Sequence, residues 1–501
     1  MKKVLALLLA IAMLAASVAS CGAKTDTPAD TTTAPTADTT TAPTDTATTA
    51  PAETLPPELQ DTLPETTFHD AVFTTLIREE TKYEMQSDEI SGDLLSDAVH
   101  KRNTLVEERF GVDLQVLTEP GDWTKRDTFT ARVSNSILGG DHEFDLVMTS
   151  DAYLASMPIR GLAYNLTELE SLDFTKKWWH KGFMNNAEIN GSIYIAAGDA
   201  AVTVYEYLEV VFFNKKLAAE NGIPDLYALV ESGTWTWDKM MEYVLTVGSD
   251  VNGDGIYDVS DIYGLGLDAG TTRHVTTYWE TNMSIVGADG LRDINLPNEK
   301  YLDTYNRLYA AIHDNTQVFY AKDAGTYAAY DNASMFINDQ FLFLVKDLGD
   351  AVKMKEMESE YGIIPFPKYD TTQQNYISTI KDSFSGMMVS SAIQEPDMVG
   401  TVIEALSMYG YQDITPAYYE TALKLKYLSD ETAMKMIDLI RDSVVLEFTM
   451  IYTNSLNLMF SLVSNSLIKE VPNISSSIKA ESKIWQKMVD KLYSDYEKIG
   501  Q

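Results

Sequence analysis

Cysteine is nearly absent from this 501-residue chain, which contains only Cys21. One cysteine cannot form a disulfide within the chain, so an apolar core must hold the fold, which is feasible at this length. Basic residues are also scarce: 38 lysines and arginines face 74 aspartates and glutamates, a net charge of −36. Nucleic-acid binding requires clustered basic residues that neutralise phosphates, so this composition argues against it.

The motifs of common enzyme classes are missing as well. The sequence has no H-E-x-x-H motif, no Walker phosphate loop and no G-x-S-x-G nucleophile turn. Among so many acidic residues, any choice of two as a glycosidase pair would be arbitrary. The histidines are scattered without the spacing of metal ligands: His69, His100, His142, His180, His274 and His313. We therefore expect a binding protein and not an enzyme.

The chain begins with the order of features that marks a secretory signal. Lys2 and Lys3 precede an apolar run at residues 4–16, and small residues follow at 17–20. The apolar run is shorter than the roughly 20 residues that a membrane-spanning helix needs. Residues 1–20 are therefore predicted to be a signal peptide.

The end of this signal indicates a lipid anchor. The sequence Val-Ala-Ser-Cys-Gly at residues 18–22 resembles the bacterial lipobox, in which the cysteine becomes the new N-terminus and is acylated, for example with palmitate. Cys21 is thus predicted to be lipidated. This places the protein on the extracellular face of the cytoplasmic membrane of a bacterium, bound through its lipid.

A long polar segment follows the cysteine. Residues 21–67 are rich in threonine, alanine, proline and aspartate, and no aromatic residue occurs there before Phe68. Such a composition cannot bury enough apolar surface to offset the entropy lost on ordering. We predict a disordered tether over this range.

Beyond the tether, the pattern alternates between strands and helices. Apolar runs predict strands, and apolar residues at helical spacing predict the helices, which end at glycines. A β-α-β-α-β order implies a parallel sheet with right-handed crossovers. The predicted elements are a strand at 71–77, a helix at 94–110, a strand at 112–117, a helix at 129–138 and a strand at 144–148.

Seven segments of this region carry a resemblance to a known family. They are FDLVMTS (144–150), GLAYNL (161–166), IYIAAGD (193–199), VFFNKKL (211–217), IPD (223–225), GTWTWD (233–238) and YGIIPFPKY (361–369). In this order, and within residues 68–450, they resemble the family-1 extracellular solute-binding proteins. Many members of that family are sugar-binding lipoproteins of ABC transporters.

The resemblance implies an α/β fold like that of periplasmic binding proteins, with two α/β lobes joined by hinge strands and a ligand cleft between them. The first crossing is expected near residues 199–207, and the return near 333–336. The last part of the chain is expected to be helical, since Val402, Ala405 and Leu406 have helical spacing. The implied boundaries are 68–200 for the first lobe, 201–332 for the second, 333–394 for the return to the first, and 395–501 for C-terminal helices on the second.

One motif indicates a metal. Residues 250–261 place oxygen-bearing side chains at positions 1, 3, 5, 9 and 12, and a glycine at position 6, as calcium loops do. The last ligand is an aspartate where an EF-hand has glutamate, and an Asn/Gly/Asp turn that binds nothing is the alternative. We predict one structural calcium ion held by Asp250, Asn252, Asp254, the backbone carbonyl of Ile256, Asp258 and Asp261.

The position of residues in the family pattern suggests ligand contacts. A sugar presents C–H groups that stack on aromatic rings, and hydroxyls that need polar side chains. The predicted ligand-binding residues are Ser150, Asp151, Tyr153, Asp199, Tyr205, Trp279, Asn338, Asp339 and Phe341.

The function implied by the resemblance is that of a monomeric receptor that captures a mono- or oligosaccharide and delivers it to an ABC permease in the membrane. A receptor for a peptide or an organic ion is one alternative. A carbohydrate-active surface enzyme or an adhesin that shares the lipid anchor is another.

Overall fold

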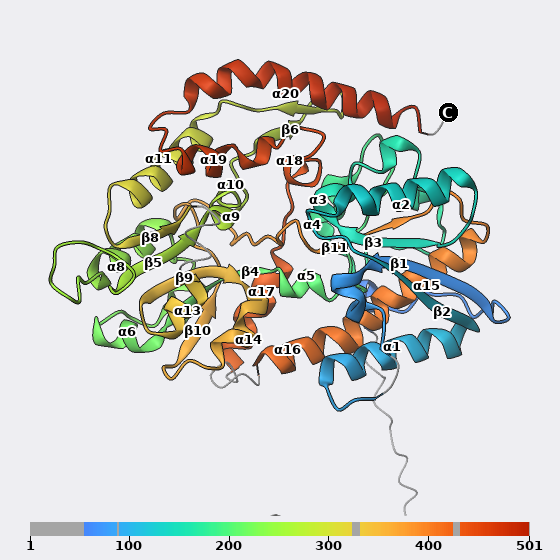
Figure 1. The fold of residues 1–501 in the computed structure, drawn as a ribbon, viewed down its shortest axis with the longest axis horizontal. Coiled ribbons are helices and arrows are strands. Elements are labelled where there is room, and N and C mark those ends of the chain that lie inside the picture. The colour runs from blue at the N-terminus through green and yellow to red at the C-terminus, as the bar shows by residue number, and fades with distance from the viewer. Residues whose placement is uncertain (1–54, 88–89, 323–330, 424–430, 500–501) are drawn as a thin grey trace, which may run out of the picture. The chain divides into compact units, whose positions relative to one another are not determined.

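The computed structural model describes residues 55–87, 90–322, 331–423 and 431–499, the last three residues of the third range by their backbone only (Figure 1). The predictions for the signal peptide, for Cys21 and for the tether up to residue 54 lie outside the described residues. No helix in the described ranges is long and apolar enough to cross a membrane.

The first lobe is built on a four-stranded sheet. Strand β1 pairs in parallel with both β2 and β3, and β11 runs antiparallel to β3. The predicted parallel β-α-β-α-β unit is therefore confirmed. In spatial order the strands are β11 (Ser385–Val389), β3 (Leu146–Ser150), β1 (Ala71–Arg78) and β2 (Val112–Glu119).

Helix α1 (Leu94–Phe110) connects β1 to β2, and α2 (Arg126–Gly139) connects β2 to β3 (Figure 1). The Asp93 side chain accepts a hydrogen bond from the Ser96 amide at the start of α1, which is the usual role of an N-cap. Gly111 ends the helix with a φ of 57°, a left-handed conformation that favours glycine. Local sequence thus determines where α1 begins and ends.

The second lobe is built on a five-stranded mixed sheet. Every residue of β4, β5 and β9 is buried, as expected for strands covered by helices on both faces. Strand β4 is antiparallel to its neighbours β10 and β9, whereas β5 is parallel to β9 and β8. In spatial order the strands are β10 (Tyr361–Ile364), β4 (Glu209–Asn214), β9 (Phe341–Asp347), β5 (Tyr263–Asp268) and β8 (Val318–Ala321).

Two of the segments that connect the lobes run side by side. Leu208 forms an antiparallel bridge with Ile380, and the Lys381 amide donates to the Tyr207 carbonyl at 2.9 Å. The first segment leads into β4, and the second leads out of the second lobe into β11. These paired crossings form the hinge.

The return to the first lobe lies later than the sequence suggested. The boundary at 333–336 is wrong for the strands that follow it, because β9 and β10 both pair within the five-stranded sheet. The segment 361–369, assigned to the first lobe by family resemblance, contributes β10 to the second. An apolar run predicts a buried strand but does not indicate which of two sheets the strand joins.

The C-terminal helices are divided between the lobes. Helix α15 (Pro396–Tyr409) packs against α1, so its predicted place on the second lobe is also wrong (Figure 1). Helical spacing identifies an apolar face but not the partner of that face. Helix α17 (Glu431–Asp442), by contrast, packs against β10 of the second lobe.

The last helices connect both lobes. Helices α18 (Phe448–Ile451) and α19 (Leu462–Ile468) precede α20 (Ser475–Tyr496). Helix α20 packs against β7 (Arg292–Ile294) in the second-lobe part of the chain. Near its other end, the Tyr496 ring lies 5.4 Å from that of Tyr194, which follows β3 of the first lobe.

The end of the predicted tether is not free. The Lys176 ammonium donates to the Pro57 carbonyl at 2.9 Å, Arg109 pairs with Asp61 at 2.6 Å, and Leu63 is buried. The predicted boundary of the tether at residue 67 is therefore too late. A few anchoring residues are enough to hold this segment, and an average composition does not reveal them.

Candidate functional site

A pocket of about 330 Å³ lies at the carboxyl end of the first lobe's sheet. Arg78 is the last residue of β1, Ser150 is the last residue of β3, and Trp123 lies in the loop after β2. Ligands in open α/β sheets commonly bind outside the carboxyl ends of parallel strands. The lining residues are Arg78, Trp123, Ser150, Ala152, Arg273, Asp382, Ser383, Thr453, Leu458 and Ser461.

The other walls come from the second lobe, the hinge and the C-terminal helices. Arg273 follows the short helix α9 (Ala269–Thr272) at the carboxyl end of β5. Asp382 and Ser383 lie on the returning crossing segment just before β11. Parts of the chain that move relative to one another in a hinged protein therefore meet around this pocket.

Hydrogen bonds tie these walls together. The Arg78 guanidinium donates to the Ser383 carbonyl at 2.8 Å and to the Ser385 hydroxyl at 3.2 Å. The Ser150 hydroxyl donates to the Asp382 carbonyl at 2.9 Å. Arg273 forms an ion pair with the Asp382 carboxylate at 2.8 Å, which links the second lobe to the hinge.

Trp123 lines the pocket and is exposed to solvent. Its side chain is 50% exposed, and the Arg126 guanidinium lies 4.3 Å from the ring centroid. Arg126 also donates to the Trp123 carbonyl at 2.6 Å, which fixes the loop. An exposed indole face beside arginine, carboxylate and hydroxyl groups matches the surface of a sugar ring.

The segment between α18 and α19 covers one side of the pocket. It contributes Thr453, Leu458 and Ser461 to the lining. Asn454 in the same segment donates a hydrogen bond to the Ala152 carbonyl of the first lobe. The C-terminal part of the chain is thus part of the site.

Of the nine predicted ligand-binding residues, Ser150 lines this pocket. Asp151 and Tyr153 follow it but lie behind the surface. Burial, reinforced by the charge of Asp382, raises the pKa of Asp151 well above its ordinary value. The Tyr153 hydroxyl donates to the Gly121 carbonyl at 2.8 Å, so it supports the Trp123 loop from below.

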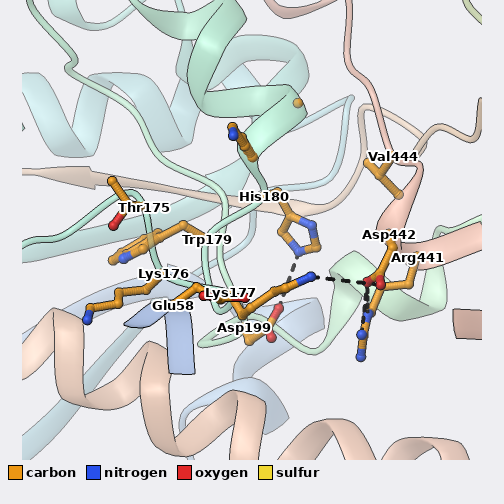
Figure 2. A pocket seen from close by; sticks show the side chains of 12 residues that line it. Glu58, Thr175, Lys176, Lys177, Trp179, His180, Asp199, Arg441, Asp442 and Val444 are labelled. Atoms are coloured by element: carbon orange, nitrogen blue, oxygen red, sulfur yellow. Dashed lines mark hydrogen bonds and ion pairs between the residues drawn. The ribbon is translucent and has the colours of Figure 1, made fainter. Parts of the chain in front are cut away.

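Asp199 and Tyr205 lie elsewhere. Asp199 lines a second pocket of about 340 Å³, where its carboxylate is 3.4 Å from the His180 ring (Figure 2). Tyr205 is fully buried and shares a hydrogen bond of 2.7 Å with the Thr415 hydroxyl of α16 (Thr415–Leu423). Neither lines the Trp123 pocket.

The candidates from the second lobe are structural. Trp279 is fully buried, donates to the Pro367 carbonyl at 3.1 Å and packs on Trp237. Phe341 is a fully buried residue of β9. Both residues therefore lie in the core of the second lobe, and neither lines the Trp123 pocket.

Asn338 and Asp339 lie at the turn before β9. Asn338 donates to the Ser334 carbonyl at 2.9 Å. Asp339 accepts from Asn214 at 2.6 Å and from Lys216 at 2.8 Å, which lowers its pKa against the effect of burial. These groups stabilise the amino-terminal end of a strand, and neither lines the pocket.

The arginines and the tryptophan of the pocket were not among the predicted ligand-binding residues. Arg78 directly follows the predicted strand 71–77, and Trp123 follows the predicted strand 112–117 by a few residues. Both positions are carboxyl ends of strands in a predicted parallel sheet, and this signal could have identified them. Asp382 and Arg273 had no comparable signal, because their placement depends on the path of the hinge.

The predicted calcium loop is held together by its own backbone. Asp250 accepts hydrogen bonds from the Gly253 and Gly255 amides at 2.7 and 2.8 Å. Asp261 accepts from the Val251 and Asp258 amides at 2.9 and 2.8 Å. Within the described residues, no three His, Cys, Asp or Glu side chains converge as a metal site. Calcium binding stays a prediction for this loop.

Comparisons with known proteins place the fold. No protein-family model matches the sequence, and no curated protein matches it. Solved structures do match: the sugar-binding protein MalE from Xanthomonas citri has a TM-score of 0.59 and 11% identity, covering 85% of this chain and 99% of that chain.

Two further structures match in the same way. A sugar transporter from Rhizobium etli has a TM-score of 0.55 and 14% identity, covering 84% of this chain and 99% of that one. The GacH receptor of Streptomyces glaucescens, solved unliganded and with acarbose, has a TM-score of 0.54 and 12% identity, with coverage of 84% and 99%. The chain therefore has the two-lobed α/β fold of the sugar-binding proteins of ABC transporters.

Proposed function

We propose that the protein is an extracytoplasmic solute-binding receptor that captures a carbohydrate and presents it to an ABC import permease. The observation that carries the proposal is the pocket at the carboxyl ends of β1 and β3, where an exposed indole lies beside arginine, carboxylate and hydroxyl groups. Structures with this fold are named for binding sugars, which supports the same class of ligand here.

The walls of the pocket come from both lobes, and this explains how a ligand would be captured. A ligand that contacts Trp123 in the first lobe and Arg273 in the second is held better when the lobes are closed. Binding then shifts the population toward the closed form by the difference in affinity between the two forms. The permease would recognise that closed form.

The lipid anchor is proposed from the sequence at Cys21. Acylation there would keep the receptor at the extracellular face of the cytoplasmic membrane, close to the permease. Cells supplied with labelled palmitate should incorporate it into the wild-type protein. The Cys21→Ser variant should be released from the membrane, and unchanged membrane association of that variant would contradict the anchor.

A ligand screen tests the receptor function. We expect one or more mono- or oligosaccharides to raise the melting temperature of the purified protein by mass action, because ligand binds only the folded state. Peptides and organic ions are included as competing ligand classes. Turnover of an oligosaccharide, or a shift with peptides alone, would contradict the proposal.

A further inference from the structure

The charges of the residues that line the pocket are not balanced. Arg78 is 6% exposed and Arg102 of α1 is fully buried, and a guanidinium remains charged at any physiological pH. Within the described residues, neither arginine lies within ion-pair distance of a carboxylate, and their hydrogen bonds go to neutral acceptors. Arg78 lines the pocket, so it brings there a positive charge that has no ion-pair partner in the described part of the chain.

Three nearby carboxyls could offset part of this charge: Glu84, Glu80 and Asp122. Glu80 accepts a hydrogen bond from the Gly121 amide, and the charges of Arg78, Glu80 and Asp122 all shift the pKa of Tyr153, so these groups lie in one neighbourhood. Glu84 lies close enough to interact with both arginines, but its own pKa is raised by burial. Within the described residues, none of these three carboxylates lies within ion-pair distance of Arg78, whose guanidinium bonds to neutral acceptors. Asp151 adds little, since burial and Asp382 both favour its neutral form.

The remaining charges of the pocket cancel. Arg273 is paired with Asp382 at 2.8 Å, which leaves Arg78 as the lining residue whose charge has no partner. This excess is opposite in sign to the chain as a whole, which carries a net charge of −36. Among the charged residues that line the pocket, positive charges therefore outnumber negative charges by one.

We propose that the ligand of this pocket is an anionic saccharide, whose carboxylate or phosphate group binds toward Arg78 while a sugar ring stacks on Trp123. The planar fork of a guanidinium matches both anions, which are acceptors only. The inference rests on the proposed receptor function and narrows its ligand class.

Matched pairs of sugars test it by calorimetric titration. Digalacturonate is compared with its methyl ester, and glucose 6-phosphate with glucose, alongside neutral malto-oligosaccharides. At least one acidic member should bind about tenfold or more tightly than its neutral partner at low salt, and the preference should shrink in 0.5 M salt. Whichever acid is preferred identifies the anion as carboxylate or phosphate.

Variants locate the anion. Arg78→Gln should abolish the preference for the acid, and Arg78→Lys should retain part of it, because it keeps the charge but not the fork. The matched control Arg132→Gln removes a surface arginine that pairs with Glu143 in the first lobe and should change nothing. If neutral sugars bind as well as acidic ones, the inference is overturned and the receptor function stands. If no saccharide binds, both fail.

Discussion

Buried charges at the hinge and at the cleft are partnered differently. Beside the hinge, three buried carboxylates have a basic partner: Glu209 with His274 at 2.5 Å, Asp347 with Lys381 at 2.7 Å and Asp268 with Lys346 at 3.1 Å. At the cleft, Arg78 bonds to neutral groups. The difference indicates that the hinge charges complete the fold by themselves, whereas the cleft retains charge for a ligand.

The largest expected effect comes from breaking a hinge pair. His274 and Glu209 are fully buried, and the Tyr278 hydroxyl also donates a hydrogen bond to the Glu209 carboxylate. His274→Leu leaves the Glu209 carboxylate buried without its partner, so the free energy of unfolding should fall by about 3–5 kcal/mol. Urea denaturation measures this fall in the free energy of unfolding.

The control for that prediction is a surface pair. Lys101→Met removes an exposed partner of Asp413 and should cost less than about 1 kcal/mol. Equal losses in the two variants would show that the hinge pairs are no more structural than surface pairs.

Glu206 is a half-buried carboxyl that has no ion-pair partner among the described residues, so it should make the stability of the protein depend on pH. Burial and the nearby Glu84 raise the pKa of Glu206 to about 7, against the hydrogen bond from Tyr83. A raised folded-state pKa in an acid means that its contribution to stability is fully present below about 4.5 and is lost as the pH rises toward 7.

Glu206→Gln should therefore flatten the fall in stability between pH 4.5 and 7 by up to about 3 kcal/mol. Unfolding followed by circular dichroism across that pH range measures the slope. Glu431, an exposed acid with an exposed lysine partner, serves as the control through Glu431→Gln. An unchanged slope in Glu206→Gln would contradict the assignment.

Trp123 should affect the ligand and not the fold. Its half-exposed ring contributes little to the core, so Trp123→Ala should leave the melting temperature nearly unchanged. Loss of stacking should weaken binding of the sugar found in the screen by about 1–2 kcal/mol. Leu138→Ala, at an exposed position of α2, is the control. Wild-type affinity in the Trp123 variant would mean that the ligand does not contact this loop.

The smallest effect concerns the loop at residues 250–261. If it binds calcium, millimolar calcium should raise the melting temperature of the wild type by about one degree, roughly the effect of 1 kcal/mol in a chain of this length. Asp250→Ala should remove that response. An identical melting temperature in calcium and in EDTA would mean that the Asx hydrogen bonds alone hold the loop.

Local sequence determined much of the first lobe and little of the site. The predicted strands at 71–77 and 112–117 and the helix at 94–110 match β1, β2 and α1 closely, because capping and periodicity are local properties. Ser150 was identified because it ends a strand. Asp382 was not, because only the tertiary path of the hinge brings it to the pocket.

Two differences between the predictions and the structure have the same physical origin. The segment at 361–364 was assigned to the wrong sheet, and Trp279 to the cleft instead of the core. In both cases the residue type was correct for a buried position. Long-range packing decides which sheet or core buries such a residue. Composition and spacing carry no information about that packing.

Hydrogen exchange with and without the saccharide that binds best would show where the ligand lies. We expect the ligand to protect the amides of the Trp123 loop, the end of β3, the Arg273 turn, the segment at 380–385 and the residues between α18 and α19. Protection confined to the pocket that contains Asp199, or absent from both lobes, would contradict this expectation.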